Sequence, residues 1–154
     1  MAASKGVCVV VGVGPGIGQA VAKRFGRAGY ELALIARRKE ALDGFVEGLK
    51  VAGVTATAIP ADAEHAPSLV DALTKIHNDI GPVDVLVYNA AVIKRGSPFD
   101  VGVEQLVREF RVNVGGALVA AQQVVPAMKA KKQGTILFTG GGLALDPWPA
   151  MSSL

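Results

Sequence analysis

Glycine dominates the first stretch of the chain whose spacing suggests chemistry. The segment from Gly12 to Gly18, GVGPGIG, lies between an apolar run over residues 7–11 and a helical pattern over residues 16–28. A strand that ends in a tight glycine turn points the next helix N-terminus at the edge of the sheet, where free amides and the helix dipole suit a pyrophosphate. Side chains in the turn would hold the phosphates away. The segment therefore predicts a nucleotide-binding turn rather than a turn without a ligand.

The glycine spacing fits two classes of nucleotide-binding protein. Gly12-x3-Gly16-x-Gly18 is typical of short-chain dehydrogenases/reductases, and Gly12-x-Gly14-x-Gly16 is typical of the first motif of S-adenosylmethionine methyltransferases. The common dinucleotide spacing, Gly-x-Gly-x-x-Gly, fits from neither Gly12 nor Gly14, because Ile17 or Gln19 would take the third glycine position. The spacing alone leaves both classes open.

The end of the second predicted strand bears on this choice. A ribose with a free 2′-hydroxyl calls for an acidic side chain there, whereas a 2′-phosphate calls for arginine. The strand predicted over residues 32–36 ends in Ala36 and is followed by Arg37 and Arg38. Guanidinium groups bind phosphate oxygens in bidentate geometry. A methyltransferase would need an acid here and another at Val10, and both are missing. The pattern favours NADP(H) over NAD(H) and disfavours the methyltransferase.

Three further motifs follow in the order of the short-chain dehydrogenase/reductase family, which the chain closely resembles. Asp62 matches the acidic residue near the adenine. The segment YNAA over residues 88–91 matches Asn-Asn-Ala-Gly, with Tyr88 and Ala91 as departures. Asn113-Val-x-Gly matches the long interface helix, where the asparagine belongs to the catalytic tetrad. The cofactor-binding residues implied by the loop, the strand ends and this resemblance are Gly12, Gly14, Pro15, Gly16, Ile17, Gly18, Arg37, Arg38, Asp62, Ala63, Asn89, Ala90 and Ala91, and the implied catalytic residue is Asn113.

The catalytic serine and tyrosine of this family have no counterpart at the matching positions. Gly141 matches the serine, and the count to the tyrosine ends at Leu154. The resemblance implies that the tyrosine protonates the substrate oxygen, that a lysine four residues later lowers its pKa and that the serine positions the carbonyl. We therefore expect an NADP(H)-dependent oxidoreductase acting on carbonyls or alcohols, inactive as this 154-residue chain. The alternative is a non-catalytic NADP(H)-binding protein, either a sensor or an inactive partner subunit.

Apolar runs of strand length alternate with helical patterns along the chain. Strands are predicted over residues 7–11, 32–36, 54–59, 83–87 and 135–139, and helices over 16–28, 39–52, 66–79 and, with a break between Asn113 and Gly116, 103–132. Because the strand runs are continuously apolar rather than alternating, they indicate a parallel sheet covered on both faces. The sequence predicts one α/β domain over residues 1–154, a doubly wound three-layer Rossmann fold truncated after its fifth strand. Core candidates include Leu69, Leu73, Ile76, Phe110 and Met128.

Composition excludes several other classes. Half of the residues are apolar, so a disordered chain is not expected, and the net charge of +3 is too small for a nucleic-acid surface. No apolar run reaches the roughly 18 residues of a membrane span. Cys8 is the only cysteine, which excludes a disulfide framework and favours the cytoplasm. His65 and His77 lack the spacing of metal ligands. The expected partners are a small carbonyl or alcohol substrate and, from the family resemblance, further copies in a homodimer or homotetramer.

Overall fold

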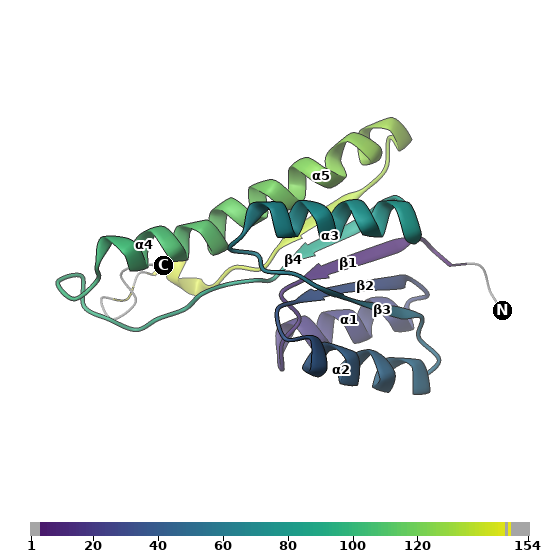
Figure 1. Cartoon of the computed structure of the whole chain (residues 1–154), viewed down its shortest axis with the longest axis horizontal. Helices are drawn as coiled ribbons and strands as arrows, with labels where there is room; N and C mark the ends of the chain where they lie inside the picture. Colours follow the sequence, from purple (N-terminus) through teal and green to yellow (C-terminus); the bar gives the residue numbers. More distant parts are fainter. Residues whose placement is uncertain (1–3, 147, 149–154) are drawn as a thin grey trace.

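The computed structural model describes residues 4–146 and residue 148, and its centre is a parallel five-stranded sheet (Figure 1). The strands are β1 (Val7–Val11), β2 (Glu31–Ala36), β3 (Ala56–Pro60), β4 (Val83–Tyr88) and β5 (Thr135–Phe138). Their spatial order is β3-β2-β1-β4-β5. The helices between them are α1 (Ile17–Arg27), α2 (Lys39–Val51), α3 (Ala66–Asp79), α4 (Val103–Phe110) and α5 (Gly116–Lys131). This arrangement confirms the predicted doubly wound α/β fold.

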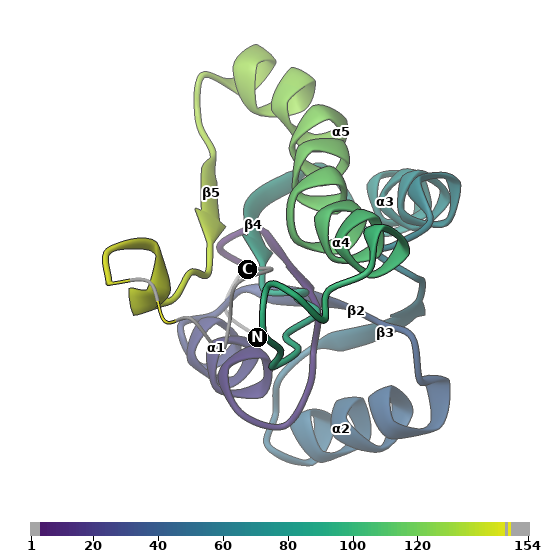
Figure 2. The same cartoon turned by 90° about the vertical axis from the view of Figure 1, so that its left-hand side faces the viewer.

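The helices form the two outer layers, because the chain crosses to the other face of the sheet after β3. Figure 2 shows α1 and α2 on one face and α3, α4 and α5 on the other. Alternate residues of β1 serve the two cores: Val9 packs in the cluster with Leu69 of α3, and Val10 packs in the cluster with Val46 of α2. The continuous apolar strands β1, β2 and β4 are stable here because both of their faces are covered, whereas β5 at the edge is largely exposed.

Most predicted boundaries agree with the structure to within one or two residues, and the helix over 66–79 agrees at both ends. Leu69, Leu73, Ile76 and Met128 are buried, as predicted. The prediction for Phe110 is wrong, because its side chain is 61% exposed. In α4 the apolar stripe faces outward, and Glu109 is only 1% exposed. The prediction assumed that the apolar side of each helix faces the sheet, and in α4 this side faces away from the sheet.

The predicted break near Asn113 to Gly116 corresponds to an interruption between two α-helices, but it is a π-helical turn and not an end of the helix. The helix continues from α4 into α5 through a π-helical turn, Arg111–Gly115, in which the Gly116 N–H donates to the Arg111 carbonyl. The buried Tyr88 hydroxyl donates to the carbonyl of Val112 in this turn. A Cβ at Gly116 would lie 2.2 Å from the Tyr88 hydroxyl oxygen. The widened turn and the glycine therefore accommodate the tyrosine, and they place Asn113 toward the chain that follows β4.

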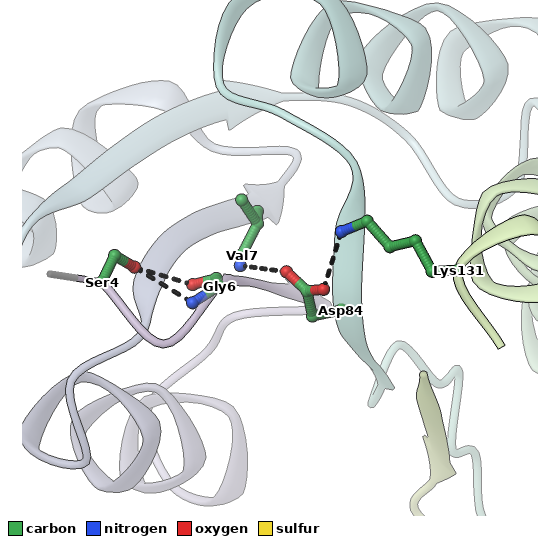
Figure 3. Close-up of polar contacts among 5 residues, drawn as sticks. All are labelled: Ser4, Gly6, Val7, Asp84 and Lys131. Atoms are coloured by element: carbon green, nitrogen blue, oxygen red, sulfur yellow. Dashed lines mark hydrogen bonds and ion pairs between the residues drawn. The ribbon is translucent and has the colours of Figure 1, made fainter. Parts of the chain in front are cut away.

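A polar clamp fastens the opposite, amino edge of the sheet (Figure 3). The Asp84 carboxylate of β4 accepts a hydrogen bond of 2.8 Å from the backbone N–H of Val7 in β1. Its other oxygen lies 2.9 Å from the ammonium nitrogen of Lys131, at the end of α5. One carboxylate thus joins three elements and fixes where β1 begins. The carboxyl ends of the strands, where ligands bind in this architecture, are left for the functional site.

Candidate functional site

A cleft of about 480 Å³ opens at the carboxyl ends of β1, β2, β3 and β4. All but three of the predicted binding residues line it, namely Gly12, Gly14, Pro15, Arg37, Arg38, Asp62, Ala63, Asn89, Ala90 and Ala91. Gly16, Ile17 and Gly18 are not among its lining residues. Four segments that are far apart in the sequence therefore meet around one cavity, as expected for the carboxyl edge of a doubly wound sheet.

Two glycines of the turn serve packing within the protein. Gly12 has a φ of +89°, and a Cβ there would lie 2.3 Å from the backbone nitrogen of Ala90. A Cβ at Gly18 would lie 2.6 Å from the carbonyl oxygen of Gly12. Gly12 thus lets the chain after β4 approach the turn, and Gly18 lets α1 approach it. The absence of a side chain at Gly12 and Gly18 thus serves packing within the protein, and their predicted role toward phosphates stays a prediction.

The other two glycines leave open space. A Cβ at Gly14 or Gly16 would meet no atom within 4 Å, and the φ of +114° at Gly16 itself requires glycine. The first turn of α1 carries no acidic side chain. The backbone N–H groups of a first helical turn lack partners inside the helix, and they carry the positive end of its dipole. The open side of the turn is therefore suited to an anion.

Two arginines stand at the end of β2. Both Arg37 and Arg38 are exposed, both line the cleft, and neither forms an ion pair within the part of the chain that the structure describes. The neighbouring Lys39, by contrast, pairs with Asp43. Ala36, the last residue of β2, supplies no acceptor for a hydroxyl. The cleft therefore has two uncompensated guanidinium groups at this wall.

Asp62 combines a turn role with a place in the cleft wall. One of its carboxylate oxygens accepts a 3.0 Å hydrogen bond from the backbone N–H of Glu64, and its own N–H donates to the Ser68 hydroxyl at 3.2 Å. These contacts shape the turn into α3. The predicted ligand role is compatible with this, because the second carboxylate oxygen of Asp62 forms no hydrogen bond within the described residues and the residue lines the cleft.

Asn89 ties three strands together at the floor of the cleft. Its side-chain nitrogen donates to the Gly12 carbonyl at 2.9 Å, and its side-chain oxygen accepts from the Thr139 hydroxyl at 3.0 Å. The Thr139 N–H also donates to the Tyr88 carbonyl at 3.1 Å. Sequence reasoning missed Thr139. Thr139 could have been found from its position directly after β5, because the register of β4 and β5 places Phe138 beside Tyr88 and therefore Thr139 near Asn89.

Asn113 uses its whole amide group to hold the chain that follows β4. Its side-chain oxygen accepts from the Val92 N–H at 2.8 Å, and its side-chain nitrogen donates to the Val92 carbonyl at 3.0 Å. Val92 lines the cleft. In this structure the side chain of Asn113 therefore positions one wall of the cleft.

The described chain offers few proton donors near the cleft. Burial and the charge of Asp62 raise the pKa of Tyr88 to about 12, and its hydroxyl is already bonded to Val112. Gly141, which matches the serine position, is exposed and extended, and a Cβ there would meet nothing within 4 Å. Leu154 lies outside the described residues. Within the described part, no three His, Cys, Asp or Glu side chains gather as a metal site.

Cys8 is expected to be unreactive in the folded protein. It lies at 0% exposure within β1, and burial raises its pKa to about 12. Ellman's reagent at pH 8 should therefore label the thiol only after unfolding in urea, because the thiolate is the reactive form. The contribution of the neutral thiol to stability should be full below pH 9 and decline as the pH rises toward 12. Labelling of the native protein at the rate of a free thiol would contradict this.

No helix among the described residues combines the length and the apolarity needed to cross a membrane.

The profile of the short chain dehydrogenase family matches residues 6–153. A 2,3-dihydro-2,3-dihydroxybenzoate dehydrogenase of Bacillus subtilis (strain 168) is 29% identical over 147 residues, covering 96% of this chain and 56% of the relative. Versicolorin reductase 1 of Aspergillus parasiticus is 31% identical over 139 residues, covering 90% of this chain and 52% of the relative. The chain thus spans about half the length of these curated relatives.

Solved structures give the same result. A metagenomic short-chain oxidoreductase in complex with NADP has a TM-score of 0.89 and 29% identity, covering 97% of this chain and 69% of that one. A short-chain dehydrogenase/reductase of Serratia marcescens has a TM-score of 0.87 and 28% identity, covering 97% of this chain and 61% of that one. The matching family is that of the short chain dehydrogenases. The chain belongs to the short-chain dehydrogenase/reductase family, as its sequence motifs, its strand order and its similarity to these proteins show.

Proposed function

We propose that the cleft binds NADP(H) and that the parent protein is an NADP(H)-dependent oxidoreductase for a carbonyl or alcohol substrate. The observation that carries this proposal is the pair Arg37 and Arg38, which line the same cleft as the glycine turn without an acidic partner among the described residues. A 2′-phosphate would neutralise this charge, whereas the 2′-hydroxyl of NAD(H) would find Ala36 where an acid is needed. The metagenomic relative was solved with NADP.

The proposed contacts follow from the walls of the cleft. The pyrophosphate would lie in the open space at Gly14 and Gly16, against the first turn of α1. Arg37 would take the 2′-phosphate, with Arg38 beside it, and Asp62 with Ala63 would border the adenine. Asn89, Ala90 and Ala91 would line the nicotinamide side, supported by Asn113. The cofactor would supply or accept the hydride, and the protein binds and orients it.

We propose in addition that copies of the chain associate in the cytoplasm as a homodimer or homotetramer. The outward stripe of α4 and α5 carries exposed apolar side chains at helical spacing, namely Val103, Val107, Phe110, Val114 and Leu118. Such a stripe is typical of a helix that packs against a partner.

A second candidate function is non-catalytic NADP(H) binding, as in a sensor or an inactive partner subunit. It is favoured by Gly141, which stands at the serine position without a side chain, and no atom of the described residues lies within 4 Å of the place of its Cβ. The cleft residues are the same in both proposals, and only turnover distinguishes them.

Arg37→Ala should weaken NADPH binding about 10- to 100-fold and leave NADH binding unchanged. A charge-assisted hydrogen bond contributes roughly 1.5–3 kcal/mol, and each 1.4 kcal/mol is about tenfold in affinity. Nicotinamide fluorescence titration of both cofactors measures this. Lys39→Ala is the matched control, because that neighbouring cation pairs with Asp43 and does not line the cleft. Equal wild-type affinities for the two cofactors, or an equal loss for both in the variant, would contradict the proposal.

A further inference from the structure

Two segments leave the carboxyl edge of the sheet side by side. One follows β4 and the other follows β5, and these neighbouring parallel strands place Tyr88 beside Phe138 at their ends. Figure 2 looks onto this edge and shows both segments there. They meet again farther along the chain, where the guanidinium carbon of Arg95 lies 5.5 Å from the centroid of the Trp148 ring. The cation–π contact thus closes a bridge between them beside the cleft.

The charge on this bridge is uncompensated. Lys94 and Arg95 are adjacent and exposed, and neither has an acidic partner within the described residues. A guanidinium that lies over an aromatic ring uses its face for that contact and keeps its N–H edge for a bidentate anion. Trp148, which is 53% exposed, also leaves apolar surface next to the two cations. Cations beside an aromatic face are suited to a carboxylate attached to a flat apolar group.

The position of the bridge along the chain places it next to the cleft. Val92 lines the cleft and is held by Asn113, and Arg95 follows only three residues later, at most about 10 Å away along an extended chain. On the β5 side, Gly140 to Gly142 present no side chains, and a Cβ at any of them would meet nothing within 4 Å. The described residues on this side therefore add no side chain next to these three glycines.

We propose that Lys94, Arg95 and Trp148 form the anchor for a cyclic or aromatic carboxylate, which makes such carboxylates the substrate class of the site. This inference rests on the proposed function, because it assigns the carboxylate end of the substrate whose other end meets the cofactor. Arg95 binds the carboxylate oxygens, Lys94 adds charge, and the Trp148 ring covers one face of the ligand.

The test uses Trp148 itself, because it is the only tryptophan in the chain. Its fluorescence, excited at a wavelength that benzoate does not absorb, is followed during titration with sodium benzoate and with benzamide, its neutral analogue, with and without NADPH. We expect saturable binding of benzoate at least tenfold tighter than that of benzamide. Arg95→Ala should remove this preference, Arg95→Lys should keep part of it, and Lys94→Ala should reduce it.

Controls separate this inference from the proposed function. Arg27→Ala, an exposed arginine in the last turn of α1, should bind benzoate as the wild type does. Arg95→Ala should bind NADPH normally, which shows that it is folded. Equal binding of benzoate and benzamide, or unchanged benzoate binding in Arg95→Ala, would overturn the anchor. Loss of the NADPH preference with benzoate binding intact would overturn the proposed cofactor and leave the anion site standing.

Discussion

Gly12→Ala should destabilise the folded chain by about 2–6 kcal/mol, a large share of the roughly 5–15 kcal/mol that holds a domain together. Two causes add at this position. A residue other than glycine at a φ of +89° carries roughly 1–3 kcal/mol of backbone strain. The new Cβ would also lie 2.3 Å from the backbone nitrogen of Ala90, and crowding of this kind typically costs a further 1–3 kcal/mol or so. Neither neighbour is a flexible side chain that can move aside.

Urea unfolding followed by circular dichroism measures the effect, and two glycines provide matched controls. Gly14→Ala adds the same methyl group two residues later in the same turn, where nothing lies within 4 Å, and should change stability by less than about 0.5 kcal/mol. Gly48→Ala lies inside α2 in open space and should stabilise the chain by roughly 0.5–1 kcal/mol. A Gly12 variant as stable as the Gly14 variant would mean that the turn can rearrange.

The parts of the fold that could be predicted are those that local chemistry determines. The strand over 7–11 is a continuous apolar run, and the helix over 66–79 has a regular apolar stripe and a Gly-Pro stop after it. These features depend on residues close in sequence, so a single sequence contains them. The position of the cleft could also be predicted, because the carboxyl ends of parallel strands meet at one edge of the sheet whichever side chains they carry.

The features that could not be predicted depend on contacts between distant residues. The interruption near Asn113 could be predicted, but its π-helical form could not, because its Val112 carbonyl accepts from the hydroxyl of Tyr88, more than twenty positions earlier in the chain. The orientation of α4 is a second example. Its apolar residues face outward, while Glu109 is buried with only Gln105 as a partner and one carboxylate oxygen without a hydrogen bond in the described part. Helical periodicity gives a stripe but not the side of the molecule on which it lies.

The separate roles of the four glycines in the turn could not be predicted from the sequence. The sequence contains four glycines with a common expected purpose, and the structure separates them into two that permit packing and two that border open space. This separation depends on the position of Ala90 and of α1, which no local pattern specifies. The same holds for Thr139, because its bond to Asn89 exists only when β4 and β5 are neighbours.

The 154-residue chain should show no measurable turnover of NADPH with aldehydes, ketones or quinones. Reduction of a carbonyl builds negative charge on oxygen, and an acid must protonate it. The chain has Gly141 at the serine position and Leu154 at the tyrosine position, and neither side chain can donate a proton. Loss of a positioned general acid typically slows a reaction about 10²- to 10⁴-fold, and loss of an oxyanion partner about 10²- to 10³-fold. The losses need not multiply, because such groups act as a unit.

The measurement is NADPH oxidation against that substrate panel, for the 154-residue chain, for the parent protein and for the double variant Gly141→Ser/Leu154→Tyr in the parent. Gly141 tolerates the change, because its backbone is extended and its surroundings are open. The double variant should raise turnover at least about 100-fold if the two positions are the missing groups. Fast turnover by the 154-residue chain would show that the active site has been misplaced. If the unmodified parent protein turns over NADPH and the 154-residue chain does not, the catalytic groups lie in parts of the parent protein outside this chain. Binding without turnover in the parent protein would support the non-catalytic function, because the cleft around Arg37 and Gly14 would then bind the cofactor without taking part in a reaction.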